Sequence, residues 1–252
     1  MSLHAIVETL SRPGLLSIAG RSAEKRLQHA LEAYFRILGR KILALGLQKL
    51  AADHPKSMVR HAVHVRMHNT LRITTPLLRA ALETGIQHGM MTASKIHHFA
   101  ETAPEDLPTD ATSIVAADYA SQSAGQLVTG INSTTLKIIQ TAIETGIDEQ
   151  LGVFGTASLL QDTVSNMTQY RSQVIATTEM NDAMSESMLR KLGSIGVEWK
   201  QWITGTQCCD ICADNEDSSP IPIDAVFPSG DDRPPAHPNC RCAIAGSRPP
   251  QD

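Results

Sequence analysis

Aromatic residues are scarce in this sequence, where they make up only 4% of 252 residues. Strands of β-sandwiches and barrels favour aromatic and β-branched side chains, so this scarcity argues against an all-β fold. Long apolar runs are also missing, because no stretch reaches the roughly 18–20 residues that cross a bilayer. The N-terminus lacks the basic-then-apolar pattern of a signal peptide, since His4, Glu8 and Thr9 interrupt its apolar stretch. We therefore expect a soluble protein made in a reducing cytoplasm, with no membrane contact.

Catalytic signatures are missing as well. The sequence contains no G-x-S-x-G elbow, no P-loop, no H-E-x-x-H pair and no G-x-G-x-x-G fingerprint. Glu179 and Asp224 are single carboxylates without a partner that the sequence reveals. These absences predict that the protein is not an enzyme.

Charge is distributed unevenly along the chain. Residues 1–100 carry 14 Lys and Arg against 5 Asp and Glu, whereas residues 101–252 carry 8 against 21. The formal net charge of -4 therefore conceals a basic part and an acidic part. Such an asymmetry predicts two surfaces with different partners.

Helical periodicity dominates the first 193 residues. Apolar side chains such as Leu27, Leu31 and Leu38 recur at spacings of three and four, which predicts a helix over 23–52 that ends at His54-Pro55. Further helices are expected over 56–74, over 77–85 after a restart at Pro76 and over 111–127. Two more are expected over 136–145, with a cap at Ser133 or Thr134 and an end at Gly146, and over 158–192.

The chain also divides by composition. A segment rich in proline and acidic residues, 103–110, coincides with the change in charge. After Gly193 a short strand-like run leads to Thr204-Gly205, and eight prolines follow without helical periodicity. We expect a basic helical region at 1–105, a helical core at 106–193 and a Cys/His-rich module at 194–252. The predicted fold is mainly α, with a small, irregular, zinc-knuckle-like α+β module at the C-terminus.

Cysteine is absent from the first 207 residues, and all five cysteines lie between positions 208 and 242. Cys209 and Cys212 form a C-x-x-C pair, and His237 and Cys240 form an H-x-x-C pair 24 residues later. Each spacing places two donors on one tight turn, so two such pairs can surround one Zn²⁺ tetrahedrally. A site with four protein ligands has no open position for water and is structural rather than catalytic.

The ligand set has an open alternative, because Cys242 can replace His237, while Cys208 is expected to be a spectator. Two other interpretations of the cluster also stay open. The thiols can be buried and unligated, or they can form a disulfide or take part in redox chemistry. No oxidising compartment is indicated for a disulfide, and a thioredoxin-like C-x-x-C belongs in a βαβ unit that this context lacks.

The C-terminal pattern resembles a known family. Trp199-Lys200-Gln201-Trp202-Ile203-Thr204, the C-x-x-C pair and the closing His237-Pro238-Asn239-Cys240-Arg241-Cys242 together resemble the signature of the phage Mu F-like minor head proteins, the phage head morphogenesis domain. Residues 128–135 and 171–192 resemble the family's upstream helices, so the resemblance covers roughly 110–245. Two positions depart from the pattern. Thr177-Thr178-Glu179 stands in place of an Arg-Thr-Glu triplet, and Thr206-Gln207 stands in place of Asp-Arg.

The resemblance implies a non-enzymatic minor capsid protein of a tailed bacteriophage. Its expected partners are the portal protein and the capsid or scaffold proteins, with packaged DNA as a further contact. It would assist head assembly or DNA packaging and ejection. Its expected location is the virion, inside the capsid at the portal vertex, and the host cytoplasm during assembly. The alternative, from another class, is a zinc-dependent nucleic-acid-binding or nuclease-like protein.

Basic residues of the N-terminal region form a second candidate site: Arg36, Arg40, Lys41, Arg60 and Arg66. They can form an ordinary solvated face, dock on an acidic portal or capsid surface, or contact DNA phosphates. No aromatic residues interleave with them, which argues against stacking on single-stranded bases.

Three histidines, His61, His64 and His68, share one predicted helix face. Two of them could bind a metal. Nearby arginines repel cations, however, so a solvated or interface role is favoured.

Overall fold

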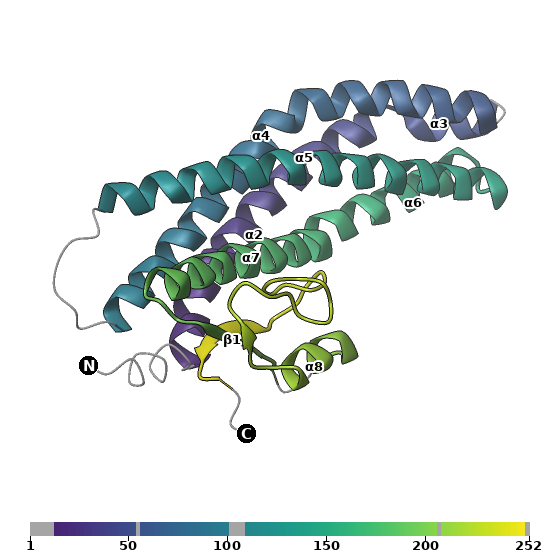
Figure 1. Ribbon diagram of the computed structural model, residues 1–252. Coiled ribbons are helices and arrows are strands. Elements are labelled where there is room, and N and C mark those ends of the chain that lie inside the picture. The colour runs from purple at the N-terminus through teal and green to yellow at the C-terminus, as the bar shows by residue number, and fades with distance from the viewer. Residues whose placement is uncertain (1–12, 54–55, 101–108, 206–207, 250–252) are drawn as a thin grey trace. The chain divides into compact units, whose positions relative to one another are not determined.

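The computed structural model describes residues 13–53, 56–100, 109–205 and 208–249, and it is mainly helical (Figure 1). The helices are α2 (Pro13–Ala44), α3 (Leu47–Asp53), α4 (Lys56–Ala100), α5 (Thr109–Asp148), α6 (Gly152–Asn166), the π-helical turn η1 (Met167–Arg171), α7 (Ser172–Ser194) and α8 (Asp210–Asp217). The strands are β1 (Trp199–Ile203), β2 (Ile221–Pro222) and β3 (Ala243–Ser247). The predicted mainly α fold with a small C-terminal α+β module is confirmed. No helix of the described residues is both long and apolar enough to cross a membrane.

The predicted restart at Pro76 is wrong, because α4 runs through this proline. A proline inside a helix removes one backbone hydrogen bond and crowds the preceding turn. In α4 the hydroxyls of Thr74 and Thr75 donate to carbonyls of that turn, at Thr70 and Leu71. Burial of the helix on both sides of the proline then outweighs the local cost.

Two other predicted boundaries are also wrong. The residues proposed as caps, Ser133 and Thr134, lie inside the continuous helix α5, as does Gly146. The predicted first helix instead breaks near its end, where Gly46 has a φ of 63° between α2 and α3. The sharp change of direction requires a left-handed backbone conformation at this position, and glycine adopts that conformation without strain. The short helix α8 was not predicted, because it has a single turn of apolar residues in a proline-rich segment.

The contacts of the chain define two compact units that are not contiguous in sequence. The first consists of Met1–Leu27, Thr84–Ala120 and Val174–Asp252, and the second of Gln28–Glu83 and Ser121–Gln173. The division expected at residues 105 and 193 follows sequence character rather than contacts, and it stays a prediction.

In the second unit the apolar stripes predicted for the helices form the interior. Leu31 and Leu38 of α2 and Met67 of α4 are fully buried. Arg171, on the π-turn, reaches into this interior, donates to the carbonyl of Ile131 at 3.0 Å and lies 5.5 Å from the ring centre of Phe35. Burial lowers the pKa of Arg171. A half-buried cation is tolerated here because its donors have partners.

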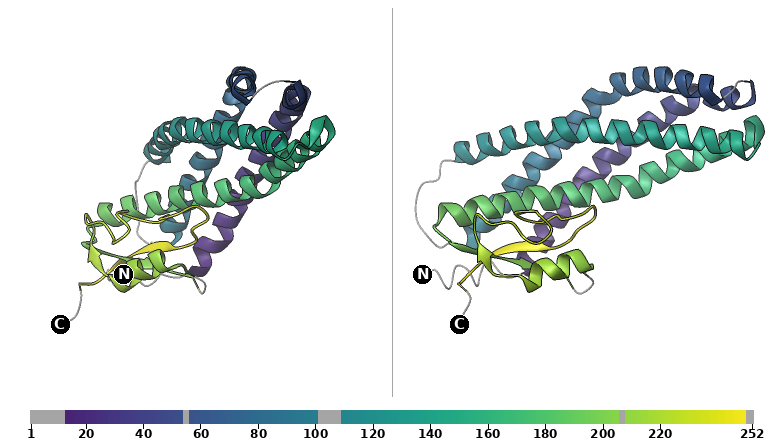
Figure 2. Two further views of the ribbon diagram at one scale, coloured as in Figure 1. Left: turned by 90° about the vertical axis from the view of Figure 1, so that its right-hand side faces the viewer. Right: turned by 45° about the vertical axis from the view of Figure 1, so that its right-hand side comes forward.

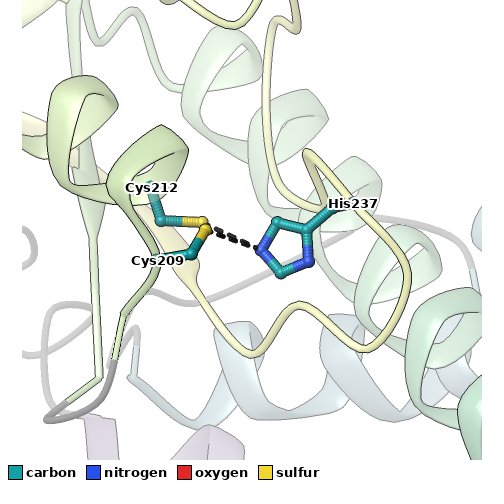
Figure 3. A group of neighbouring side chains, drawn as sticks. All are labelled: Cys209, Cys212 and His237. Atoms are coloured by element: carbon teal, nitrogen blue, oxygen red, sulfur yellow. Dashed lines mark hydrogen bonds between the residues drawn. The ribbon is translucent and has the colours of Figure 1, made fainter.

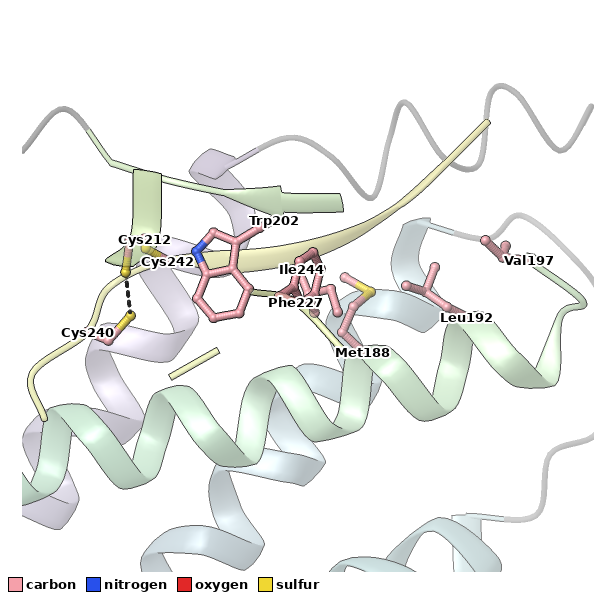
Figure 4. Close-up of a cluster of buried hydrophobic side chains, with 9 residues drawn as sticks. All are labelled: Met188, Leu192, Val197, Trp202, Cys212, Phe227, Cys240, Cys242 and Ile244. Carbon is pink, nitrogen blue, oxygen red and sulfur yellow. Dashed lines mark hydrogen bonds between the residues drawn. The ribbon is translucent and has the colours of Figure 1, made fainter. Parts of the chain in front are cut away.

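In the first unit the strands form an antiparallel sheet of order β2-β1-β3. Trp202 of β1 packs edge-on against Phe227, with ring centres 5.0 Å apart. Met188 and Leu192 of α7 complete the same cluster (Figure 4). The cluster includes the buried cysteines, so the small module has an apolar core that continues into its sulfur-rich end.

Replacement of two helical glycines by alanine should have opposite effects on the stability of the protein. A Cβ at Gly39 of α2 would overlap the buried, β-branched Val164 of α6, whereas a Cβ at Gly130 of α5 meets nothing within 4 Å. We expect Gly39→Ala to lower the free energy of unfolding by about 1–3 kcal/mol through overpacking. Gly130→Ala should raise it by about 0.5–1 kcal/mol, because alanine is the better helix former. Chemical denaturation measures both, and equal signs would contradict the packing described for α2 and α6.

Candidate metal centre

The two donor pairs predicted from the sequence lie on two different structural elements. Cys209 is the N-cap of α8, and Cys212 lies within the first turn of that helix. His237 and Cys240 lie in the loop that precedes β3. Figure 3 shows the two α8 cysteines facing the His237 ring across the gap between helix and loop. The long segment between the pairs therefore folds so that the pairs meet, as the motif spacing predicted.

The distances between donor atoms are those of ligands that share one ion. Nε2 of His237 lies 3.2 Å from Sγ of Cys209 and 3.3 Å from Sγ of Cys212. Sγ of Cys212 lies 3.8 Å from Sγ of Cys240. Tetrahedral Zn²⁺ with its usual bond lengths would place its sulfur ligands about 3.8 Å apart and a sulfur and a nitrogen about 3.6 Å apart. These three separations are therefore compatible with donors that share an ion of this size.

Two groups of three donors, both containing Cys212, can hold a metal ion: Cys209, Cys212 and His237, and Cys212, Cys240 and Cys242. Within each group the donor atoms all lie within 4.8 Å of one another. None of the five cysteines forms a disulfide. Cys208 is exposed beside the cluster and belongs to neither group. Which four atoms complete one site stays a prediction.

The histidine is oriented for ligation. Its Nδ1 lies 2.9 Å from the carbonyl oxygen of Pro238, which can only accept a hydrogen bond. Nδ1 of neutral His237 therefore carries the proton, and the lone pair of Nε2 points at the two sulfurs. A carbonyl that fixes the tautomer in this way is the usual second partner of a metal-binding histidine.

The thiols differ in their electrostatic surroundings. The backbone N–H of Cys212, at the start of α8, lowers the pKa of Cys209. A hydrogen bond from the neighbouring Cys242 thiol lowers the pKa of Cys240 to about 5. The same hydrogen bond raises the pKa of Cys242. Burial raises the pKa of Cys212 to about 12. A cation at the centre would favour the thiolate form of each ligand.

Helix α7 holds the second donor pair in place. Asn181 donates to the carbonyl oxygen of Cys240 at 3.0 Å, and the backbone N–H of Asn239 donates to Oγ1 of Thr178 at 2.9 Å. Asn239 has a φ of 62°, so the loop turns sharply at the point where α7 grips it. Both views in Figure 2 show the module beside α7.

The same helix binds the arginine between the last two cysteines. Arg241 donates to Oε1 of Glu24 and to Oγ1 of Thr177, both at 3.3 Å, and Thr177 also donates to Glu24 at 2.6 Å. Thr177 and Thr178 belong to the Thr-Thr-Glu triplet that departs from the family pattern. Sequence reasoning missed their contact with the H-P-N-C-R-C segment, because the two segments lie more than 60 residues apart in the chain.

A further cation joins the module to α7 and was not predicted. Arg233 pairs with Asp182 at 2.9 Å, with Glu186 at 3.2 Å and with Asp232 at 2.9 Å. Tyr119 of α5 donates to Asp182 in the same network. Arg233 is only 17% exposed, and its pKa is raised because the acidic groups outweigh the opposing effect of burial. No short motif marks such a residue, since its partners lie far away in sequence.

The structure separates the basic candidates into residues that are exposed on α2 and residues that contact other parts of the protein. Arg36, Arg40 and Lys41 are exposed on α2. Arg60 instead pairs with Glu144 of α5, and Arg66 donates to the carbonyl of Leu45.

The histidine candidates lie on the surface of α4. His61, His64 and His68 are exposed, and the rings of His64 and His68 stack with centres 6.2 Å apart.

Comparison of the chain with protein-family profiles, with curated proteins and with solved structures finds no match. The resemblance to the phage head proteins therefore depends on the residues quoted for it above.

Glu179 of α7 gives a pH-dependent prediction. Burial of the Glu179 carboxyl raises its pKa from 4.5 to about 8, and the negative charge of the nearby Asp182 adds to this effect. The folded protein then binds a proton that the unfolded chain has released, so stability falls as pH rises from about 4.5 to about 8. We expect Glu179→Gln to be more stable than the parent chain by about 1–3 kcal/mol near pH 9, and equally stable near pH 4.

Urea unfolding across this pH range measures the effect, with the exposed Glu198→Gln as the matched control. The same pH profile in the Glu179→Gln variant and the parent chain would show that Glu179 titrates normally.

The donor cluster predicts metal-dependent stability. Cys240→Ser should abolish metal binding and lower the melting temperature, because the ion links α8 to the loop before β3. Cys208→Ser removes an exposed neighbouring thiol and should change neither property. Elemental analysis and thermal unfolding of both variants test this. Metal-free parent protein with the melting temperature of the loaded form would refute a stabilising ion.

Proposed function

We propose that the protein is a minor head protein of a tailed bacteriophage that docks on the portal inside the capsid, and that a structural Zn²⁺ holds its C-terminal module. One observation carries the proposal. The C-x-x-C pair and the H-P-N-C-R-C segment, which resemble the signature of that family, supply two groups of three metal-ligating side chains that share Cys212. The role is assembly rather than chemistry.

Zinc is the metal that this donor set favours. Thiolates and a neutral imidazole in a tetrahedral arrangement suit Zn²⁺ better than the hard, oxygen-seeking Mg²⁺ or Ca²⁺. Cys209, Cys212, His237 and Cys240 would hold the ion, with Cys242 hydrogen-bonded beside Cys240. Bound zinc would contribute folding energy to a module whose apolar cluster is small.

Helix α2 supplies the charge for docking. Among the described side chains of α2, every exposed charged residue is basic. These residues are Arg21, Lys25, Arg26, Arg36, Arg40 and Lys41. A surface with one sign of charge attracts a partner of the opposite sign. An acidic face of the portal or of a capsid or scaffold protein fits this requirement, and packaged DNA is a further phosphate-bearing partner.

Coexpression with the phage portal protein tests the assignment. We expect the two proteins to co-purify, and the double variant Arg36→Glu, Arg40→Glu to reduce the yield of complex by about tenfold. Lys137→Glu, an exposed charge reversal on α5, is the matched control and should leave the yield unchanged.

Mature particles should contain the protein in few copies. Its absence from them, or cleavage of DNA by the purified protein with added divalent metal, would overturn the proposal in favour of the nuclease-like alternative.

A further inference from the structure

A groove of about 390 Å³ lies within the first unit, beside the donor cluster. Met180, Met184 and Met188 of α7 line one side at successive helical turns, and Ile203 of β1 and Ile244 of β3 line it from the sheet. Met180 and Met188 are each only 2% exposed. The groove shares Met188, Cys240, Cys242 and Ile244 with the buried cluster around Trp202, so its floor is apolar.

The polar residues of the groove carry an excess of positive charge. Arg21, Glu24 and Arg241 all line it. Glu24 already accepts hydrogen bonds from Arg241 and Thr177, so its charge is compensated within the protein. Arg21 is exposed, and within the described part of the chain it forms no ion pair, because Glu24 of the same groove pairs with Arg241. A ligand that supplies a carboxylate would complete this part of the groove.

Methionine side chains are unbranched and polarisable, and they adapt to apolar groups of different shape. Met184 is half-buried and lies between the buried Met180 and Met188, so it presents an adaptable side chain to an aliphatic or aromatic side chain of a peptide. The other wall includes main-chain segments at the end of β1 and from Cys240 to Ile244, which have the length of a short peptide. Pockets of this kind combine apolar walls with few polar groups that fix orientation.

We infer that this groove is the docking site for a segment of a partner protein in which apolar side chains stand next to a carboxylate. The inference rests on the proposed docking function and names the surface and the chemistry of the contact. Charge complementarity with Arg21 selects an acidic segment over a basic one.

The groove is coupled to the metal centre. Cys240 and Cys242 form part of its wall, and Cys240 is also a donor of the candidate centre. Loss of the ion would release the loop that carries this wall. Binding of the segment should therefore weaken when the metal is removed, even though no atom of the segment need contact the ion.

Selection from a displayed library of random short peptides, with the full-length metal-loaded protein as bait, tests the inference. We expect enriched peptides to combine apolar residues with Asp or Glu. Their affinity should fall about tenfold in Arg21→Glu and in Met184→Lys. Lys137→Glu, an exposed charge reversal on α5, and Met58→Lys, an exposed methionine on α4, are matched controls that should bind like the parent chain.

Three results would overturn the inference: no enrichment, enriched peptides that are basic, or peptides that bind the Arg21→Glu and Met184→Lys variants as well as the controls. Circular dichroism verifies that each variant is folded. Co-purification with the portal separates the two proposals. If the portal binds the groove variants normally, the docking function stands and the groove assignment fails. If the portal does not bind the parent chain, the docking function fails whatever the peptides do.

Discussion

The approach of two short donor pairs toward each other is the constraint on which the C-terminal module depends. Cys209 and Cys212 come from the start of α8, and His237 and Cys240 come from the loop before β3. Without a link between them, β1 and its two short neighbours would have to hold together a proline-rich segment on a small apolar cluster. The sulfur atoms lie at the edge of that cluster, so a bound ion and the packing around Trp202 reinforce the same arrangement.

Helix α7 gives this module a rigid support through chemically different contacts. Thr178 and Asn181 bind the backbone of the second donor pair, Met188 packs into the apolar cluster, and Asp182 and Glu186 pair with Arg233. From its sequence alone, this polar, methionine-containing helix, whose single glycine lies at its C-terminal end, resembles an ordinary surface helix. Its composition makes sense once each of its turns is matched to a different part of the module.

The sequence predicted the elements that local chemistry determines. The donor pairs, the strand at β1 and the long helical stretch through α7 followed from spacing and periodicity, and the structure contains them. The breaks expected at Pro76 and Gly146 did not occur, because tertiary burial outweighs the local preference of single residues. Arg233 and the contacts of Thr177 could not be predicted, since they join positions that are distant in the chain and carry no periodic signal.

The charge asymmetry of the sequence also acquires a physical meaning. Part of the basic excess is neutralised inside the second unit, where Lys56 and Arg60 of α4 pair with Asp148 and Glu144 of α5. The two halves of the sequence thus compensate each other along these helices. Helix α2 differs, because its exposed cations have no acidic residue exposed among them. A net charge summed over half the chain therefore overstates the basic surface, because some of its cations are paired. The exposed cations of α2 form a basic surface without exposed acidic residues, and an acidic partner would be attracted there.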